Sequence, residues 1–196
     1  MSPTGLLEAE HRIIRRVVNT MLLLAAALER DGDVESTTWP KIVDFMRTFA
    51  EQVHHGKEEG HLFPILKRKG VPVAGYPLEA LIRDHEKTQA LTQELAEATE
   101  TYLRGGIGAK ANLIRSLRGL IDLYPNHMWK EEYLLFPMAN RLMSPRQQRD
   151  LRERFAATDA AIGADAYRQF EQLADQLADQ VGGFNRHAPR DDVWLP

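Results

Sequence analysis

The feature that most constrains this chain is an internal repeat of two histidine-bearing segments. The segment HHGKEEGHLFP at residues 54–64 matches HMWKEEYLLFP at 127–137, and EHRIIRR at 10–16 is loosely repeated as DHEKTQA at 84–90. The first pair is offset by 73 residues (127 minus 54) and the second by 74 (84 minus 10). A near-constant offset indicates a duplicated structural unit. The sequence therefore predicts two helical hairpins of one design, joined head to tail.

Apolar residues recur at alternating steps of three and four along most of the chain, which is the period of an amphipathic helix. No run of residues alternates as a strand does. The sequence thus predicts an all-α fold, an up-and-down four-helix bundle with one additional C-terminal helix. The predicted helices cover residues 7–28, 38–69, 78–102, 113–138 and 145–180, and the Phe-Pro pairs at 63–64 and 136–137 are expected to bend or end two of them.

The length of 196 residues suits one well-cored domain. We expect residues 1–142 to form the metal-binding bundle and residues 143–182 to form a helical extension packed on the same domain. Residues 183–196 are expected to form an irregular tail, because this stretch is polar and contains proline.

The composition excludes several classes of site. The chain has no cysteine, which rules out disulfides, thiolate metal sites and cysteine nucleophiles. The formal net charge of -3, without a long Lys/Arg run, argues against a nucleic-acid surface. No apolar run reaches the roughly 18 residues of a membrane span, and the N-terminus lacks the pattern of a secretory signal. We therefore expect a cytoplasmic protein with neither nucleic-acid nor membrane partners, and a homodimer is left open.

Six histidines and glutamates lie on helix faces that the apolar pattern assigns to the core. In a His-x-x-x-Glu motif the two side chains differ by about 40° around the helix axis, so both can point inward. Residues equally far from a hairpin loop lie at equal height, which places the members of each hairpin at one level to within about one helical turn. The six residues are His11, His54, Glu58, His85, His127 and Glu131.

These six groups need partners, because burying an unpaired carboxylate costs several kcal/mol. Two metal ions would supply them. If each glutamate bridges both ions, each ion receives two imidazoles and two carboxylate oxygens, and a coordination position stays open. Nitrogen and oxygen ligands with an open position suit iron or manganese in a redox role better than a closed structural zinc site.

The order H…HxxxE…H…HxxxE, with LFP closing the second and fourth helices, resembles the hemerythrin-like HHE cation-binding domains. The match covers roughly residues 5–140, and the segment SPRQQRDLRERF resembles an extension found in many bacterial members. The resemblance implies a hemerythrin-like bundle around a non-haem di-iron centre, oxo- or hydroxo-bridged, with manganese or zinc as substitutes. Carried over position by position, the implied metal ligands are the six residues named above.

Two helices depart from the pattern of the oxygen-carrying hemerythrins, which have five histidines and two carboxylates, including an HxxxH pair on the third helix. Here Gln89 stands four residues after His85. The fourth helix also has a glutamate at +4, Glu131, where the carriers have an aspartate at +5. The variant resembles members associated with peroxide or oxygen chemistry and with sensing, so reversible oxygen carriage is left open and is not the first expectation.

For residues near these six, the angle around the helix and the comparison of the two repeats predict whether the side chain faces the cluster or solvent. His61 faces inward one turn after Glu58, and we expect it to be a ligand, a hydrogen-bond partner of a ligand or a pocket histidine. Its counterpart in the second repeat is Leu134. Tyr124 is expected to pack in the core or to line the pocket. The residues expected to face solvent are His55, Glu59 and Glu132.

The expected function is that of a di-iron protein that binds or reacts with dioxygen, hydrogen peroxide or nitric oxide in the bundle core. Whether it turns substrate over, as a catalase, peroxidase or ferroxidase does, is left open. One alternative is a sensor or iron-storage module that signals through a partner. Another is a metal-free helical interaction domain.

Overall fold

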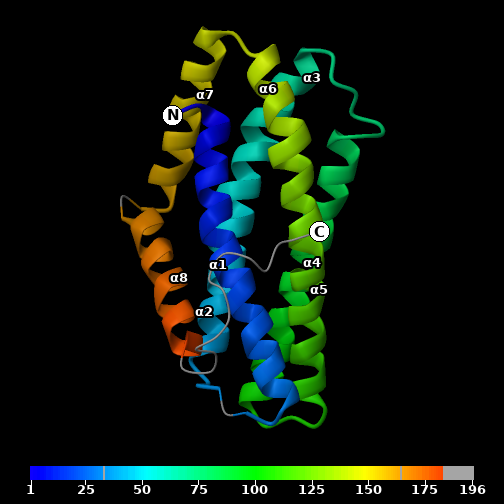
Figure 1. Cartoon of the computed structure of the whole chain (residues 1–196), viewed down its shortest axis with the longest axis vertical. Coiled ribbons are helices and arrows are strands. Elements are labelled where there is room, and N and C mark those ends of the chain that lie inside the picture. The colour runs from blue at the N-terminus through cyan, green and yellow to red at the C-terminus, as the bar shows by residue number, and fades with distance from the viewer. Residues whose placement is uncertain (33, 164, 183–196) are drawn as a thin grey trace.

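The computed structural model describes residues 1–32, 34–163 and 165–182, and all regular structure within these ranges is helical. Four long helical segments run up and down beside one another (Figure 1). In chain order they are α1 (Pro3–Glu29); α2 (Thr38–Asp44), η1 (Phe45–His55), η2 (Glu58–Leu62) and α3 (Phe63–Arg68) as one segment; α4 (Leu78–Leu103); and α5 (Ala109–Lys130), η3 (Glu131–Leu135) and α6 (Phe136–Leu142) as one segment. The predicted all-α bundle is confirmed. Among the described residues, no helix is both long enough and apolar enough to cross a membrane.

The predicted C-terminal helical segment is present, but as two helices rather than one. They are α7 (Pro145–Ala161) and α8 (Ala166–Gly182), and Gly163 between them has a φ of 118°. Only glycine adopts such a backbone conformation at little cost, so the helix breaks there. Both helices contact α1 and lie along it on one side of the bundle (Figure 1). The tail predicted for residues 183–196 lies outside the described residues.

Three π-helical segments, η1, η2 and η3, widen the second and fourth long segments. The Phe63 N–H bonds the carbonyl of Glu58, and the Phe136 N–H bonds the carbonyl of Glu131. Each such bond spans five residues and comes directly before a proline, which has no N–H to continue the ordinary pattern. The prolines therefore do not end the helices, because α3 and α6 continue beyond them.

Two clusters of buried apolar side chains fill the bundle at different levels along its length. Along α1, His11 lies between Leu7 of one cluster and Ile14 of the other. Each of the other three long segments likewise has a histidine or glutamate between a stretch in one cluster and a stretch in the other. The bundle thus encloses a polar layer between two hydrophobic layers.

Serine residues cap two of the helices. The Ser2 side chain accepts a hydrogen bond from the Gly5 N–H at the start of α1. At the start of α7, Ser144 accepts from the Gln147 N–H, and the Gln147 side chain accepts in return from the Ser144 N–H. This reciprocal capping box satisfies two backbone donors that the helix itself leaves free. It fixes where α7 begins.

We expect Ser144→Ala to lower the free energy of unfolding by about 1 kcal/mol, because it removes the side-chain half of the capping box. Chemical denaturation followed by circular dichroism measures this change. Arg149→Ala, at an exposed position of the same helix, is the matched control and should leave stability unchanged. Equal stability of the two variants would contradict the role of the cap.

Candidate metal centre

The structure brings all six histidines and glutamates predicted from the sequence into the polar layer. None of these side chains is more than 1% exposed. They come from four helical segments, so no single helix could build the cluster. The residues are His11 of α1, His54 of η1, Glu58 of η2, His85 of α4, His127 of α5 and Glu131 of η3.

The inward-facing nitrogen atoms of the histidines lie close to each other and to the carboxylates. His11 Nε2 lies 3.0 Å from His54 Nε2 and 3.1 Å from Glu131 Oε2. His127 Nε2 lies 3.4 Å from the same Glu131 oxygen. Glu131 therefore faces histidines of both hairpins.

Glu58 occupies the corresponding place in the first hairpin. Its Oε2 lies 3.4 Å from His85 Nε2 and 3.9 Å from His54 Nε2. His85 Nε2 is also 3.6 Å from Glu131 Oε1. Both glutamates thus lie between the two histidine pairs, as bridging ligands would.

The ligand atoms divide into two groups, each with its atoms within 4.8 Å of one another. The first group offers two imidazoles and two carboxylates, and the second offers three imidazoles. The groups are His11, His54, Glu58 and Glu131, and His55, His85 and His127.

Carboxylates on neighbouring helices hold the outward-facing nitrogens of two histidines. His11 Nδ1 lies 2.8 Å from Glu132 Oε1, and His85 Nδ1 lies 2.6 Å from Glu59 Oε1. Each of these pairs joins one hairpin to the other. An imidazole that donates its Nδ1–H outward presents the lone pair of Nε2 to the interior, the arrangement that a metal-binding histidine needs.

The other two histidines have carboxylates within their own hairpins. His54 Nδ1 lies 2.9 Å from Glu10 Oε2, and His127 Nδ1 lies 3.6 Å from Asp84 Oδ2. We call Glu10, Glu59, Asp84 and Glu132 the outer carboxylates. Every one of the four predicted histidine ligands therefore faces an outer carboxylate.

Two lysines neutralise the outer carboxylates of the hairpin-internal pairs. Lys57, only 1% exposed, pairs with Glu10 and also with Asp159 of α7. In the second hairpin, Lys130 Nζ lies 2.8 Å from Asp84 Oδ2. The buried lysine of the first hairpin thus connects the outside of His54 to the C-terminal extension.

The expectation that His55 faces solvent is wrong, because His55 is buried. Glu59 is exposed, as expected, and Glu132 is partly exposed, but each also bonds a histidine across a helix interface. The expectation assumed a uniform turn of about 100° per residue, whereas the π-helical segments need more residues per turn and so shift these angles. The repeated Lys-Glu-Glu and the acidic residue before His11 and His85 were the signals that could have revealed the outer carboxylates.

His55 is itself a member of the second group of ligand atoms. Its ring stacks on His85 with centroids 3.9 Å apart and lies 5.4 Å from the ring of His127. Burial and the neighbouring His85 hold the pKa of His55 well below its usual range. It is therefore a neutral imidazole inside the cluster.

The two additional predicted residues, His61 and Tyr124, lie in different places. His61 lies outside both groups, and its Nε2 is 3.1 Å from Thr158 Oγ1 of α7. Tyr124 is fully buried, with its ring 6.0 Å from that of His127. Burial and the charge of Glu51 raise the pKa of Tyr124 well above its usual value, so its hydroxyl keeps its proton.

The buried charges compete for protons in the metal-free chain. Burial disfavours the imidazolium of His11, but hydrogen bonds to Glu131 and Glu132 outweigh it and raise the pKa to about 9. Burial and the charge of Glu131 raise the pKa of Glu58 to about 8. Burial lowers the pKa of His54 to about 4. In the metal-free chain, bound protons thus balance part of the negative charge that a metal cation would balance.

The inner atoms fit a metal on their own chemistry. Both oxygens of Glu58 and of Glu131 and the Nε2 atoms of His85 and His127 are buried without a hydrogen-bond partner. Such orphaned groups are strongly unfavourable in a protein interior. Divalent cations with imidazole and carboxylate ligands would satisfy all of them.

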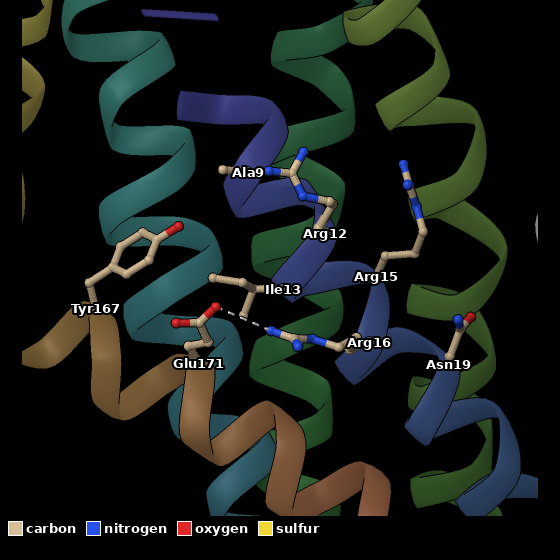
Figure 2. Close-up of a pocket in the computed structure, with 8 residues that line it drawn as sticks. All are labelled: Ala9, Arg12, Ile13, Arg15, Arg16, Asn19, Tyr167 and Glu171. Carbon is tan, nitrogen blue, oxygen red and sulfur yellow. Dashed lines mark ion pairs between the residues drawn. The ribbon is translucent and has the colours of Figure 1, made fainter. Parts of the chain in front are cut away.

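A surface pocket of about 430 Å³ lies between α1 and α8, outside the cluster. Figure 2 shows arginines of α1 along it, with Arg16 paired to Glu171. Arg15, another lining residue, donates to Glu132, the outer carboxylate of His11, at 3.0 Å. The pocket therefore adjoins the cluster through the contact between Arg15 and Glu132.

We expect Glu59→Ala to weaken metal binding by roughly 10- to 100-fold, because His85 loses the carboxylate that orients its ring. Titration with Fe²⁺ or Zn²⁺ against a chromophoric chelator measures the affinity. Glu86→Ala removes an exposed carboxylate next to His85 and serves as the control. An unchanged affinity in Glu59→Ala would contradict the role of the outer carboxylates.

The free energy of unfolding of the metal-free protein should fall as the pH rises from 7 to 9. Folded His11 and Glu58 hold protons up to pKa values of about 9 and 8, whereas their ordinary values are 6.5 and 4.5. The unfolded chain thus binds fewer protons in this range, and stability declines with pH. Bound metal displaces these protons, so its stabilising effect should grow over the same interval. Thermal unfolding in chelator and in excess metal checks both trends, and a flat chelator curve would refute the first.

Comparison with known proteins agrees with this geometry. The model of the hemerythrin HHE cation binding domain matches residues 2–139. Uncharacterized proteins of Mycobacterium bovis and of two Mycobacterium tuberculosis strains are 23% identical over 171 residues, which is 87% of this chain and 65% of theirs. The chain thus spans slightly less than two thirds of the length of these relatives, and no solved structure gave a significant match. With the family model covering most of its length, and a buried His/Glu cluster able to hold a metal, the chain belongs to the hemerythrin HHE cation binding domain family.

Proposed function

We propose that this protein binds two iron ions in its polar layer and uses them to bind or react with small oxidants, namely dioxygen, hydrogen peroxide or nitric oxide. One observation carries the proposal. Four buried histidines turn their Nε2 atoms inward around two buried glutamates, and each histidine faces an outer carboxylate at its Nδ1. The proposed ligands are His11, His54, Glu58, His85, His127 and Glu131.

The donor set supports iron. Imidazole and carboxylate are the only strong ligands in the cluster, and this mixture suits iron, with manganese or zinc as substitutes. When bound, iron supplies redox electrons and an open coordination position for a small molecule.

The protein's own residues position the ligands and keep water away. Phe136 stacks on His11 with centroids 5.6 Å apart, and Phe63 stacks on His85 at 5.8 Å. These rings belong to the apolar cluster at one end of the layer. The outer carboxylates hold the Nδ1 protons, and Tyr124, whose hydroxyl keeps its own proton, places its ring 6.0 Å from that of His127.

Anaerobic loading with Fe²⁺ followed by elemental analysis tests the proposal. We expect two irons per chain and, after exposure to air, absorption bands in the near ultraviolet. The double variant Glu58→Gln, Glu131→Gln should retain less iron and lose the bands, because amides are poor bridging ligands. The Glu86→Ala protein is the control. Absence of iron from the wild-type protein after loading would refute the proposal.

A second candidate function is that of a sensor, favoured by the contacts between the cluster and α7. Asp159 of α7 pairs with the buried Lys57, which pairs with Glu10, the outer carboxylate of His54. A change at the metal could therefore move the extension. Peroxide consumption by the iron-loaded protein separates the two functions, because turnover favours an enzyme, whereas ligand-dependent spectra without turnover favour a sensor.

A further inference from the structure

The surface pocket between α1 and α8 concentrates positive charge. Three arginines of α1 line its volume of about 430 Å³, which is within the range of small-molecule sites. The one carboxylate among its lining residues is Glu171 of α8, which pairs with Arg16. Figure 2 shows Arg12 and Arg16 on the side that faces α8 and Arg15 on the far side of α1. We call this space the arginine pocket.

The internal repeat indicates that the bundle itself does not need these arginines. α1 and α4 are equivalent helices of the two hairpins, with His11 and His85 at equivalent positions. The counterparts of the three arginines, 74 residues later in α4, carry no positive charge; they are Glu86, Gln89 and Ala90. The arginines therefore have a role confined to the α1 side of the bundle, where α8 lies.

Two of the arginines have carboxylate partners, and one does not. Arg15 donates to Glu132, and Arg16 donates to Asp175 at 2.8 Å. The Nε atom of Arg16 is nevertheless buried without a hydrogen-bond partner. Arg12 is exposed and forms no ion pair or hydrogen bond with any residue that the structure describes. The pocket thus keeps a positive charge and N–H donors that its own side chains do not use.

Tyr167 of α8 supplies a hydroxyl and an aromatic ring on the opposite wall. Burial and the charge of Glu10 raise the pKa of Tyr167 to about 12, although the charge of Arg12 lowers it, so the hydroxyl keeps its proton. Within the described part of the chain this hydroxyl has no hydrogen-bond partner, so it can donate to a bound anion. The ring packs on Phe49 at 5.6 Å between centroids, and Ile13 adds apolar surface to the pocket.

These groups fit a phosphate ester better than a carboxylate. Guanidinium groups bind oxyanions through paired N–H bonds, and a phosphate ester offers about two negative charges and three acceptor oxygens at neutral pH. Donors that converge from two helices suit a tetrahedral group rather than the two coplanar oxygens of a carboxylate. The volume exceeds that of inorganic phosphate, so the ligand has an organic part beside the Tyr167 ring.

We propose that the arginine pocket binds a small organic molecule through a phosphate monoester group, whose oxygens accept hydrogen bonds from Arg12, Arg16 and Tyr167. Bound there, the phosphate joins α1 to α8 and holds the C-terminal extension on the bundle. The site goes beyond the proposed function and does not depend on iron, because the pocket lies outside the cluster.

Isothermal titration calorimetry of the full chain with phenyl phosphate tests the proposal. Phenol, which lacks the phosphate, and benzoate, which has a carboxylate in its place, are titrated in parallel. We expect one phenyl phosphate per chain, bound severalfold more tightly than benzoate, and no binding of phenol. No saturable binding of phenyl phosphate at millimolar concentration, or an equal affinity for benzoate, would overturn the proposal.

Two variants locate the ligand in the arginine pocket. Arg12→Gln should weaken the binding of phenyl phosphate by at least about tenfold, because charge-assisted hydrogen bonds are lost. Tyr167→Phe keeps the ring but loses the hydroxyl, and it should weaken binding severalfold even if Arg12→Gln fails to fold. Arg149→Ala, at an exposed position of α7, is the control and should bind as the wild-type protein does. Unchanged affinity in either folded pocket variant would overturn the assignment.

The double variant Glu58→Gln, Glu131→Gln separates this pocket from the metal centre. It should bind phenyl phosphate with wild-type affinity although it retains less iron, and circular dichroism checks its fold. Loss of phenyl phosphate binding in this folded variant would place the ligand on the metal and overturn the proposal, while leaving the proposed function intact. Wild-type protein that takes up no iron but still binds phenyl phosphate would overturn the proposed function and support the arginine pocket.

Discussion

The structure depends on the burial of charged and polar groups in a layer between two hydrophobic clusters. Glu58 and Glu131 are fully buried, and both oxygens of each lack a hydrogen-bond partner. An uncompensated carboxylate in an interior costs several kcal/mol, a large part of the stability of a domain of this size. Together with the four histidines these groups form a cluster able to hold a cation, and the surrounding apolar layers position them without competing for it.

The outer carboxylates explain why the layer needs both hairpins. His11 is held by Glu132 and His85 by Glu59, so each hairpin supplies the carboxylate for a histidine of the other. One hairpin alone would have two of the four histidines and one of the two glutamates. One of its two histidines would then lack an outer carboxylate. The pairing therefore couples assembly of the bundle to completion of the site, and duplication of one hairpin yields both at once.

The sequence predicted which six histidines and glutamates gather in the polar layer, because that needs only periodicity and the distance of each residue from a loop. His11 and Glu58 could be placed at one level by counting alone. The residue that it misplaced, His55, lies in a π-helical segment, whose effect on side-chain angle is missed when one turn per 3.6 residues is assumed. The contact of Glu59 with His85 was missed because Glu59 was placed from the geometry of its own helix alone, whereas His85 lies on another helix. The break at Gly163 was missed because the amphipathic pattern continues on both sides of it.

The C-terminal extension breaks the twofold likeness of the bundle in the same half as His55. Lys57 pairs with Asp159 of α7 in addition to Glu10, whereas its counterpart Lys130 contacts Asp84 alone among the described charged residues. Because Lys57 is buried, removing Asp159 would leave its charge balanced only by Glu10, and the hold of Glu10 on His54 would change. The orientation of His54 is thus linked through two ion pairs to a helix outside the bundle. Among the described residues, only the half of the cluster that contains His54 has this link, so α7 is coupled to that half and not to the half that contains His127.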